Sequence, residues 1–271
     1  VFYYQFQTPK VTAAAGIFTR DMMHDDDYST AFFSESERFF HNRMNGVLAQ
    51  YNGKRDSYVE FVCDWEGMYS TLSREKFRIL LAGRHYLDTF YYGFNYSMFH
   101  YAGQQGAPIE NVVDLQLLTP CVGVRFNAFF DFDIKLGALL TAQRDRSFGH
   151  SWEKPCMGEF AFRISRWGLS LDERLYVGDN IHPFFYGHEL EDGTPLPYGR
   201  ELYPAESFFR TDQKVYSRTA LSYRRSFFDD TVSVRAEFAA HHDGTALGTQ
   251  QMLVVGVKLL KTVYNSKNHK K

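Results

Sequence analysis

The sequence contains no run of 18 or more consecutive apolar residues, which excludes a bundle of transmembrane helices. It also lacks a charge imbalance, because 30 Lys and Arg residues stand against 32 Asp and Glu residues. This balance disfavours a strongly basic nucleic-acid-binding protein. Cysteine is scarce, and Cys63, Cys121 and Cys156 lie on separate segments without a CxxC or zinc spacing. No disulfide framework, metal site or cofactor is therefore predicted.

Aromatic residues, by contrast, are abundant: 26 Phe, 18 Tyr and 3 Trp make up 17% of the 271 residues. A chain this apolar is not expected to be disordered. Abundant aromatics, 23% charged residues and the absence of long apolar runs together favour an all-β protein with two different faces. The strands of a membrane β-barrel alternate between polar and apolar residues and fit this description.

Alternation with a period of two recurs along most of the chain and is clearest between residues 129 and 144. One face of this segment holds the apolar residues Phe130, Phe132, Ile134, Leu136, Ala138 and Leu140. The other face holds Asp131, Asp133, Lys135, Gly137 and Thr141, together with Leu139. A helix would scatter the apolar residues around its axis, whereas a strand gathers them on one side. The segment is therefore predicted to be a strand.

The same criterion predicts twelve strands, at residues 10–19, 42–51, 57–66, 75–86, 90–101, 111–124, 128–143, 156–165, 167–177, 213–225, 231–242 and 249–263. A tilted strand needs about 9–11 residues to cross a bilayer, and most of these segments are long enough. Short connections (52–56, 87–89, 125–127, 166 and 226–230) alternate with longer ones (67–74, 102–110, 144–155, 178–212 and 243–248). Up-and-down barrels of outer membranes have short periplasmic turns and longer external loops.

Aromatic residues concentrate beside the short connections. They are Tyr51, Tyr58, Tyr86, Phe90, Tyr91, Phe126, Phe129, Trp167, Phe227 and Phe228. These residues are expected at one depth, where a ring of amphipathic side chains favours the membrane–water boundary. The alternative is that aromatic residues simply prefer strands and strand ends.

In these features the chain resembles bacterial outer-membrane β-barrels of the twelve-stranded kind, and its Tyr- and Phe-rich composition is similar to that of barrels from the Bacteroidota. The resemblance implies one closed, antiparallel, up-and-down transmembrane barrel over residues 10–264, located in the outer membrane. With 21–41 as an external loop, twelve strands return both termini to the periplasm. Residues 1–9 are expected to be an N-terminal segment that extends the first strand or lies in the periplasm. Residues 265–271 are expected to be a basic tail after Tyr264.

If the apolar faces meet lipid, the polar faces line a lumen whose two sides differ in charge. An acidic wall is predicted from Glu60, Asp64, Asp114, Asp131 and Asp133. A basic wall is predicted from Arg163, Arg174, Arg218, Arg224 and Arg235. Basic walls bias passage toward anions. The alternative is an interior closed by salt bridges, since a barrel of about twelve strands is narrow. Glu173 is a misfit, because it falls on an apolar face beside Leu171 and Leu175.

These walls favour a passive, porin-like channel for small polar or anionic solutes, with no enzymatic activity. The alternative is an accessory or structural barrel with a closed lumen inside a larger outer-membrane complex. The partners expected are outer-membrane lipid and other outer-membrane proteins, contacted through the 178–212 loop; nucleic acid is not one of them. The aromatic residues of that loop are Phe184, Phe185, Tyr186, Tyr198, Tyr203, Phe208 and Phe209, a composition suited to an interface.

Three other readings are weaker. A lipid hydrolase needs Ser and His on the lipid-facing side, and the spacing of Ser97 and His100 places them on opposite faces of one strand. Gly149–Ser151 is the second candidate for a hydrolase site and could be placed correctly, because it lies in a predicted external loop. Gly and Ser in loops are, however, ordinary turn formers. The acidic run 24–27 offers oxygen ligands but lacks the spacing of a calcium loop. A soluble β-sandwich or lipocalin-like protein is the remaining alternative fold.

Overall fold

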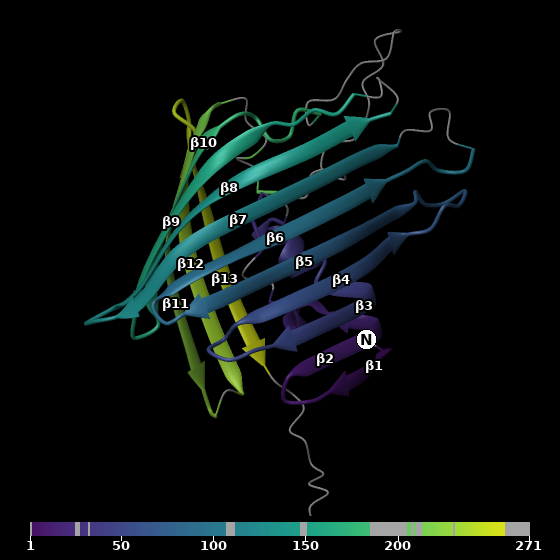
Figure 1. The fold of residues 1–271 in the computed structure, drawn as a ribbon. Helices are drawn as coiled ribbons and strands as arrows, with labels where there is room; N and C mark the ends of the chain where they lie inside the picture. The colour runs from purple at the N-terminus through teal and green to yellow at the C-terminus, as the bar shows by residue number, and fades with distance from the viewer. Residues whose placement is uncertain are drawn as a thin grey trace, which may run out of the picture.

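The computed structural model describes residues 2–24, 28–31, 33–106, 112–146, 151–184, 205–206, 209, 213–229 and 231–257. These residues form one antiparallel sheet of 13 strands, and each strand pairs with its neighbours in chain order (Figure 1). The all-β, up-and-down architecture expected from the sequence is confirmed.

The strands are long, and twelve of them match the predicted segments. Their bounds are β1 (Phe2–Gln7), β2 (Val11–Thr19), β3 (Arg43–Asn52), β4 (Tyr58–Gly67), β5 (Lys76–Leu87), β6 (Phe90–Tyr101), β7 (Val113–Asn127), β8 (Asp131–Asp145), β9 (Cys156–Arg166), β10 (Leu169–Gly178), β11 (Val215–Phe227), β12 (Val232–His242) and β13 (Leu247–Val257). Two helical segments lie between β2 and β3. They are a 3-10 turn, η1 (Arg20–Met22), and α1 (Glu35–Phe40), which the Ser34 hydroxyl caps by accepting from the Glu37 amide.

The connections leave the sheet at two edges. The short-turn edge carries residues 8–10, 53–57, 88–89, 128–130, 167–168 and 228–231. The connections that start and end at the other edge, the long-connection edge, are 20–42, 68–75, 102–112, 146–155, 179–214 and 243–246. The predicted alternation is confirmed, with 243–246 as a short member of the second group. The hairpin between β9 and β10 turns on Trp167 and Gly168, which both have positive φ. A Cβ on Gly168 would lie 2.3 Å from the Arg224 carbonyl oxygen, so this turn requires glycine.

The predicted number of strands is one too low, because β1 is a separate strand. It pairs with β2 in antiparallel register, with Phe2 opposite Ile17, and so covers the free edge of β2. The additional strand changes the edge at which the sheet begins: Phe2 lies at the long-connection edge, whereas β13 ends at the short-turn edge. The expectation that both termini lie on the same side is therefore wrong for the described residues. The predicted strand end at Tyr264 and the basic tail lie outside them.

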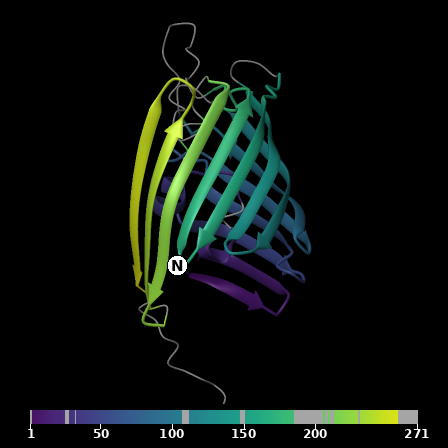
Figure 2. The same ribbon diagram turned by 90° about the vertical axis from the view of Figure 1, so that its left-hand side faces the viewer.

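The sheet curls strongly around a central space, with β1 and β2 near one end of the curl and β13 at the other (Figure 2). Within the described residues β1 and β13 pair only with β2 and β12, respectively. Both edge strands run from the long-connection edge to the short-turn edge, so they point in the same direction.

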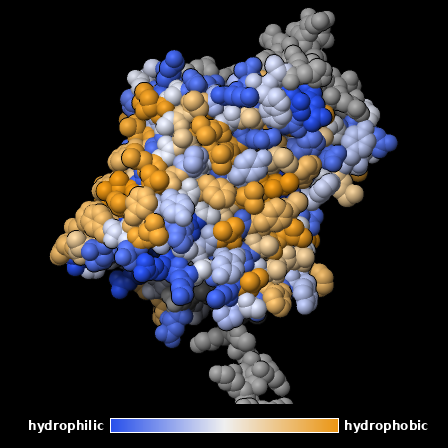
Figure 3. Space-filling view, viewed as in Figure 1, coloured by the Kyte–Doolittle hydropathy of each residue, from blue (hydrophilic) through white to orange (hydrophobic). Residues whose placement is uncertain are grey.

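The outer surface of the curl is apolar, as the alternation predicted. On β8, Leu136 is 58% exposed and Leu140 is 42% exposed, while Leu139 between them is buried inside. Exposed aromatic and aliphatic side chains continue this surface over neighbouring strands, including Val59, Phe61, Phe94, Leu118, Val122, Phe160, Leu171, Leu221, Phe238 and Leu253. Figure 3 shows apolar residues spread over the strands that face the viewer. The inner surface holds the charges. Glu60, Asp64, Arg78, Glu159 and Arg218 are buried there.

The predicted ring of aromatics beside the short turns divides into two groups. Seven of the ten side chains are exposed on the outside: Tyr51, Phe90, Phe126, Phe129, Trp167, Phe227 and Phe228. Tyr58, Tyr86 and Tyr91 are buried. The expectation is wrong for these three, because their positions face the interior; the Tyr91 hydroxyl donates to Asp133, and the Arg125 guanidinium lies over the Tyr86 ring.

Candidate functional site

The connection between β2 and β3 folds into the curl instead of forming an external loop. It is anchored by Glu60 on β4, which is fully buried. The Glu60 carboxylate accepts hydrogen bonds from the Tyr28 hydroxyl (2.9 Å), the His24 amide (2.9 Å) and the Gln50 side chain (2.5 Å). The His24 ring stacks on Tyr58, with 3.7 Å between centroids, close to the short-turn edge. The expectation that 21–41 is an external loop is therefore wrong for its described residues.

Phe33 fixes the same connection through arginine. Its ring is fully buried, and two guanidinium groups lie over it, with Arg20 4.5 Å and Arg78 4.6 Å from its centroid. Arg78 also forms an ion pair with Glu66 at 2.9 Å. A cation over the face of a desolvated ring is attracted by its quadrupole, and the contact with Arg78 orders the connection against β5.

A second inserted segment, from the connection after β10, meets the first. The His182 ring bonds the Ala31 carbonyl at 3.0 Å, and the Glu206 amide donates to the Thr30 carbonyl at 3.1 Å. Phe209 packs edge-on against Tyr176 of β10, with 4.8 Å between centroids. We call the described residues of 20–42 and 179–209 the plug, because both segments are packed against the inner face of the sheet.

The aromatic residues expected to form a loop interface are only partly described. Phe184 and Phe209 are buried in the plug, so these two side chains do not form an exposed surface. Phe185, Tyr186, Tyr198, Tyr203 and Phe208 lie outside the described residues. The contact of this loop with other outer-membrane proteins stays a prediction.

Four members of the predicted acidic wall have inward positions. Glu60 anchors the plug, and Asp64 accepts from the Asn45 amide at 2.8 Å. Asp64 also lines a cavity of about 970 Å³ beside α1, where acidic and basic side chains are both present. Asp133 accepts from the Tyr91 hydroxyl at 2.6 Å and from Arg125 at 2.7 Å. Asp131 accepts from the Asn127 side chain at the short-turn edge.

The fifth member, Asp114, was assigned to the wrong face. Its register position on β7 is opposite His100 on β6 and Arg144 on β8, all on the outer surface. Its carboxylate contacts His100 (3.0 Å), Arg144 (2.7 Å) and Arg146 (2.9 Å) near the long-connection edge. The prediction failed because an error of one residue in the alternation of a strand moves every side chain of that strand to the other face.

All five members of the predicted basic wall line one cavity of about 270 Å³. We call it the arginine cavity. Its charged lining consists of Arg38, Arg163, Arg166, Arg174, Arg218, Arg224 and Arg235, with Asp131, Asp172 and Glu237. The wall forms because successive antiparallel strands place these positions on the inner face, about 4.8 Å apart between neighbouring strands. Arg38 comes from α1, which the sequence did not assign to the lumen.

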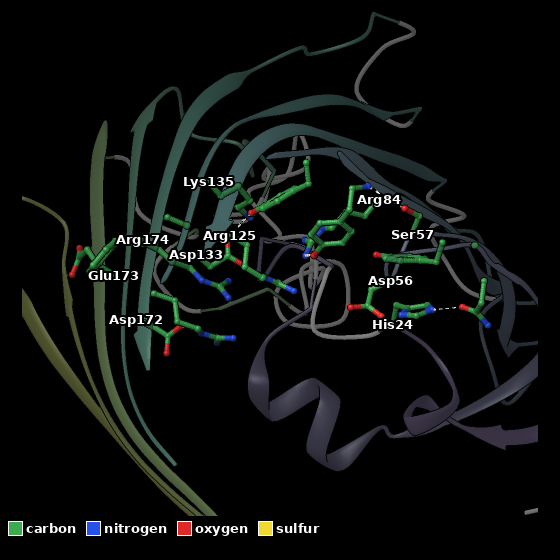
Figure 4. Close-up of a pocket in the computed structure, with 18 residues that line it drawn as sticks. His24, Asp56, Ser57, Arg84, Arg125, Asp133, Lys135, Asp172, Glu173 and Arg174 are labelled. Atoms are coloured by element: carbon green, nitrogen blue, oxygen red, sulfur yellow. Dashed lines mark hydrogen bonds and ion pairs between the residues drawn. The ribbon is translucent and has the colours of Figure 1, made fainter. Parts of the chain in front are cut away.

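A second cavity, of about 630 Å³, adjoins the first and shares Arg163, Asp172 and Arg174 with it. Figure 4 shows its side chains projecting from several strands toward the plug. The ring of Tyr91 reaches this cavity because Gly123 has no side chain: a Cβ there would lie 2.3 Å from the Tyr91 Cζ atom. Sequence reasoning missed this cavity, since it depends on the tyrosines that were placed outside.

Glu173 keeps the outward position that the alternation gives it. No register shift occurs along β10, so a bulge does not correct its orientation. Its carboxylate accepts a hydrogen bond from the Thr219 hydroxyl on β11. In Figure 4 it points away from the cavity, unlike Asp172.

The other candidates are placed as follows. Ser97 is buried inside while His100 lies outside, so this pair is separated as predicted. Asp25–Asp27 and Gly149–His150 lie outside the described residues. Among the described residues no group of three or more His, Cys, Asp or Glu side chains is arranged to hold a metal ion. No helix of that part of the chain is long and apolar enough to cross a membrane.

Comparison with known proteins adds no assignment. No protein-family model matches the chain, and no match is found among curated proteins or solved structures. The functional argument therefore depends on the geometry alone.

Proposed function

We propose that this chain is a closed β-barrel of the bacterial outer membrane whose lumen is blocked by the plug, and that it acts as an accessory or structural subunit of a larger membrane complex. The observation that carries the proposal is the reversed distribution of polarity, with an apolar outer surface and charges buried inside. A soluble lipocalin-like barrel has the opposite arrangement, because water favours polar residues outside and apolar residues inside.

The apolar outer surface and the open strand edges each have an energetic cost that depends on the solvent. Exposing side chains such as Leu136, Phe160 and Phe238 to water costs about 25 cal/mol per Å² of apolar area. Contact with lipid acyl chains removes this cost. Lipid also requires closure, because an open strand edge in hydrocarbon leaves backbone groups without hydrogen bonds. The proposal therefore includes a seam that brings β13 against the N-terminal edge of the sheet, where β1 would form a parallel pair with it.

The blocked lumen is supported by the plug contacts. Glu60 is bonded to three donors, and Phe33 is fully buried with two guanidinium groups over its ring. If the connection moved out of the interior, the buried Glu60 carboxylate would lose its hydrogen bonds from Tyr28 and His24. These contacts therefore favour a connection that remains inside.

The test is a pair of measurements on the purified chain. Reconstituted into vesicles with brominated acyl chains, the chain should show quenching of the outward-facing Trp65, which is 40% exposed. Solubility without detergent and no quenching would contradict a membrane barrel. In a planar bilayer the folded chain should show no steady conductance. Glu60→Ala, which loosens the plug, should produce openings, while Glu153→Ala, which removes an exposed carboxylate, should not.

A passive channel for small polar or anionic solutes is the second candidate, and the arginine cavity is the observation that favours it. Seven arginines face three carboxylates along its lining, and such walls attract anions. The conductance measurement separates the two candidates. Steady, anion-selective pores of the wild type, with Arg218→Glu plus Arg224→Glu shifting the reversal potential, would support the channel and contradict the blocked lumen.

A further inference from the structure

The arginine cavity carries more positive charge than its own carboxylates neutralise. Seven arginines and three acids line it, a surplus of four positive charges. Guanidinium groups remain charged at any working pH, so the surplus cannot be removed by deprotonation. Several lining side chains, including Arg163 and Arg224, reach solvent, so water as well as protein borders the cavity.

The acids of the cavity are already engaged. Glu237 accepts from Arg218 at 2.5 Å through one oxygen and from Arg235 at 2.8 Å through the other. Asp172 forms an ion pair with Arg163. Asp131 accepts from the Asn127 side chain. Each of the three carboxylates therefore already has a partner.

Arg224 is the guanidinium left over. No hydrogen bond or ion pair of its side chain is found within the described part of the chain. It lies directly opposite Arg235 in the register of β11 and β12, and both side chains face inward. Like charges at directly opposed positions repel, so this pair destabilises the empty cavity. An anion between the two guanidinium groups would reverse the sign of that interaction.

Neutral donors complete the site. The hydroxyl oxygens of Ser170 and Ser222 lie 2.7 Å apart, and both residues line the cavity beside Arg224. A hydroxyl pair that shares one hydrogen bond retains a second proton to donate. Arginine forks and hydroxyl donors are the groups that bind phosphate oxygens most effectively.

We propose that the arginine cavity is a binding site for a small soluble anion that carries phosphate groups, held between Arg224 and Arg235 with Ser170 and Ser222 as additional donors. Its volume of about 270 Å³ corresponds to on the order of nine water molecules, enough for a diphosphate group. The inward position separates it from lipid. The proposal goes beyond the barrel function and does not require the lumen to be either blocked or open.

The experiment is calorimetric titration of the full chain, folded in detergent at low ionic strength, with inorganic phosphate and pyrophosphate. Saturable binding is expected, tighter for pyrophosphate because it carries more charge. Arg224→Gln should weaken pyrophosphate binding about tenfold or more, since a charged hydrogen bond is lost. Arg55→Gln is the matched control: it removes one arginine that pairs with Asp88 in an exposed turn. Its binding should equal that of the wild type.

Three outcomes would overturn the proposal: no saturable binding by the wild type, unchanged binding by Arg224→Gln, or equal weakening by Arg55→Gln. If Arg224→Gln does not fold, Ser222→Ala removes a donor of the same site without changing charge and should also weaken binding. In nanodiscs, displacement of pyrophosphate by phosphatidic acid would assign the phosphate to a lipid headgroup and contradict a soluble ligand. A barrel that conducts, or one that does not, leaves this result unaffected.

Discussion

The two sides of the interior are built from the same alternating strands but are completed differently. On the β3–β6 side, the buried carboxylate Glu60 binds the chain's own plug through Tyr28 and His24. On the β9–β12 side, arginines outnumber acids, and Arg224 has no partner among the described residues. The acidic side is therefore satisfied by the protein itself, whereas the basic side retains a charge that needs water or a ligand. Strands with the same alternation of polar and apolar residues can therefore have different roles in the interior.

Glu60→Ala tests the acidic side and should have the largest effect. It removes the acceptor of three hydrogen bonds in a fully buried position. Each orphaned donor costs about 1–3 kcal/mol, so the three donors predict a loss of about 3–9 kcal/mol in unfolding free energy. Urea unfolding in detergent measures it, with Glu153→Ala, which removes an exposed carboxylate, as the control. A loss as small as that of the control would show that the plug is not anchored there.

Leu136→Arg tests the assignment of the outer surface, which the acidic and the basic side of the interior have in common. An arginine at the membrane midplane costs about 2–4 kcal/mol on the lipid-facing side of a barrel strand. Arg at Gly137, which faces inward near Glu159, should be tolerated better, although its Cβ would lie 3.0 Å from the Pro120 carbonyl oxygen and would require a small local shift. Folding yield into vesicles measures both variants. Equal damage at both positions would contradict the assignment of faces.

Glu173→Leu should stabilise the barrel, since it replaces an outward carboxyl by an apolar side chain. The gain is about 1 kcal/mol, because acidic residues on a lipid face cost less than basic ones. The Thr219 hydroxyl loses its acceptor in the variant but can bond a strand carbonyl. Thermal unfolding in vesicles is the measurement, and Leu171→Glu is the reciprocal control. A destabilised Glu173→Leu would indicate that the carboxyl has a partner in the membrane.

Arg224→Ala tests the basic side and should have the smallest effect on stability. The variant loses no ion pair and relieves repulsion from Arg235, so a change within about 0.5 kcal/mol, toward higher stability, is expected in anion-free buffer. Addition of pyrophosphate should then raise the stability of the wild type and not of the variant. A strongly destabilised Arg224→Ala without anion would remove the contrast between the two sides.

Local alternation allowed much of the fold to be predicted. The segment 129–144 has a period of two that places Leu136 outside and Lys135 inside, and β8 follows it. Neighbouring segments with the same period gave the strand order and the basic wall, because sequential antiparallel hairpins bring equal faces together. Asp114 shows the limit. The prediction placed it inside on a one-residue error of phase, and only pairing with His100 and Arg144 fixes its face.

The sequence by itself determined the strands, their apolar faces and the excess of arginine on the later ones, since these properties depend on residues two apart. The tertiary structure alone decided where the long connections lie. Residues 21–41 were predicted to be an external loop, yet Phe33 and Tyr28 are buried because the curled sheet offers them Arg78 and Glu60. These partners are distant in sequence, and their convergence depends on sheet curvature. That curvature also gathers seven arginines around one cavity, which no single strand specifies.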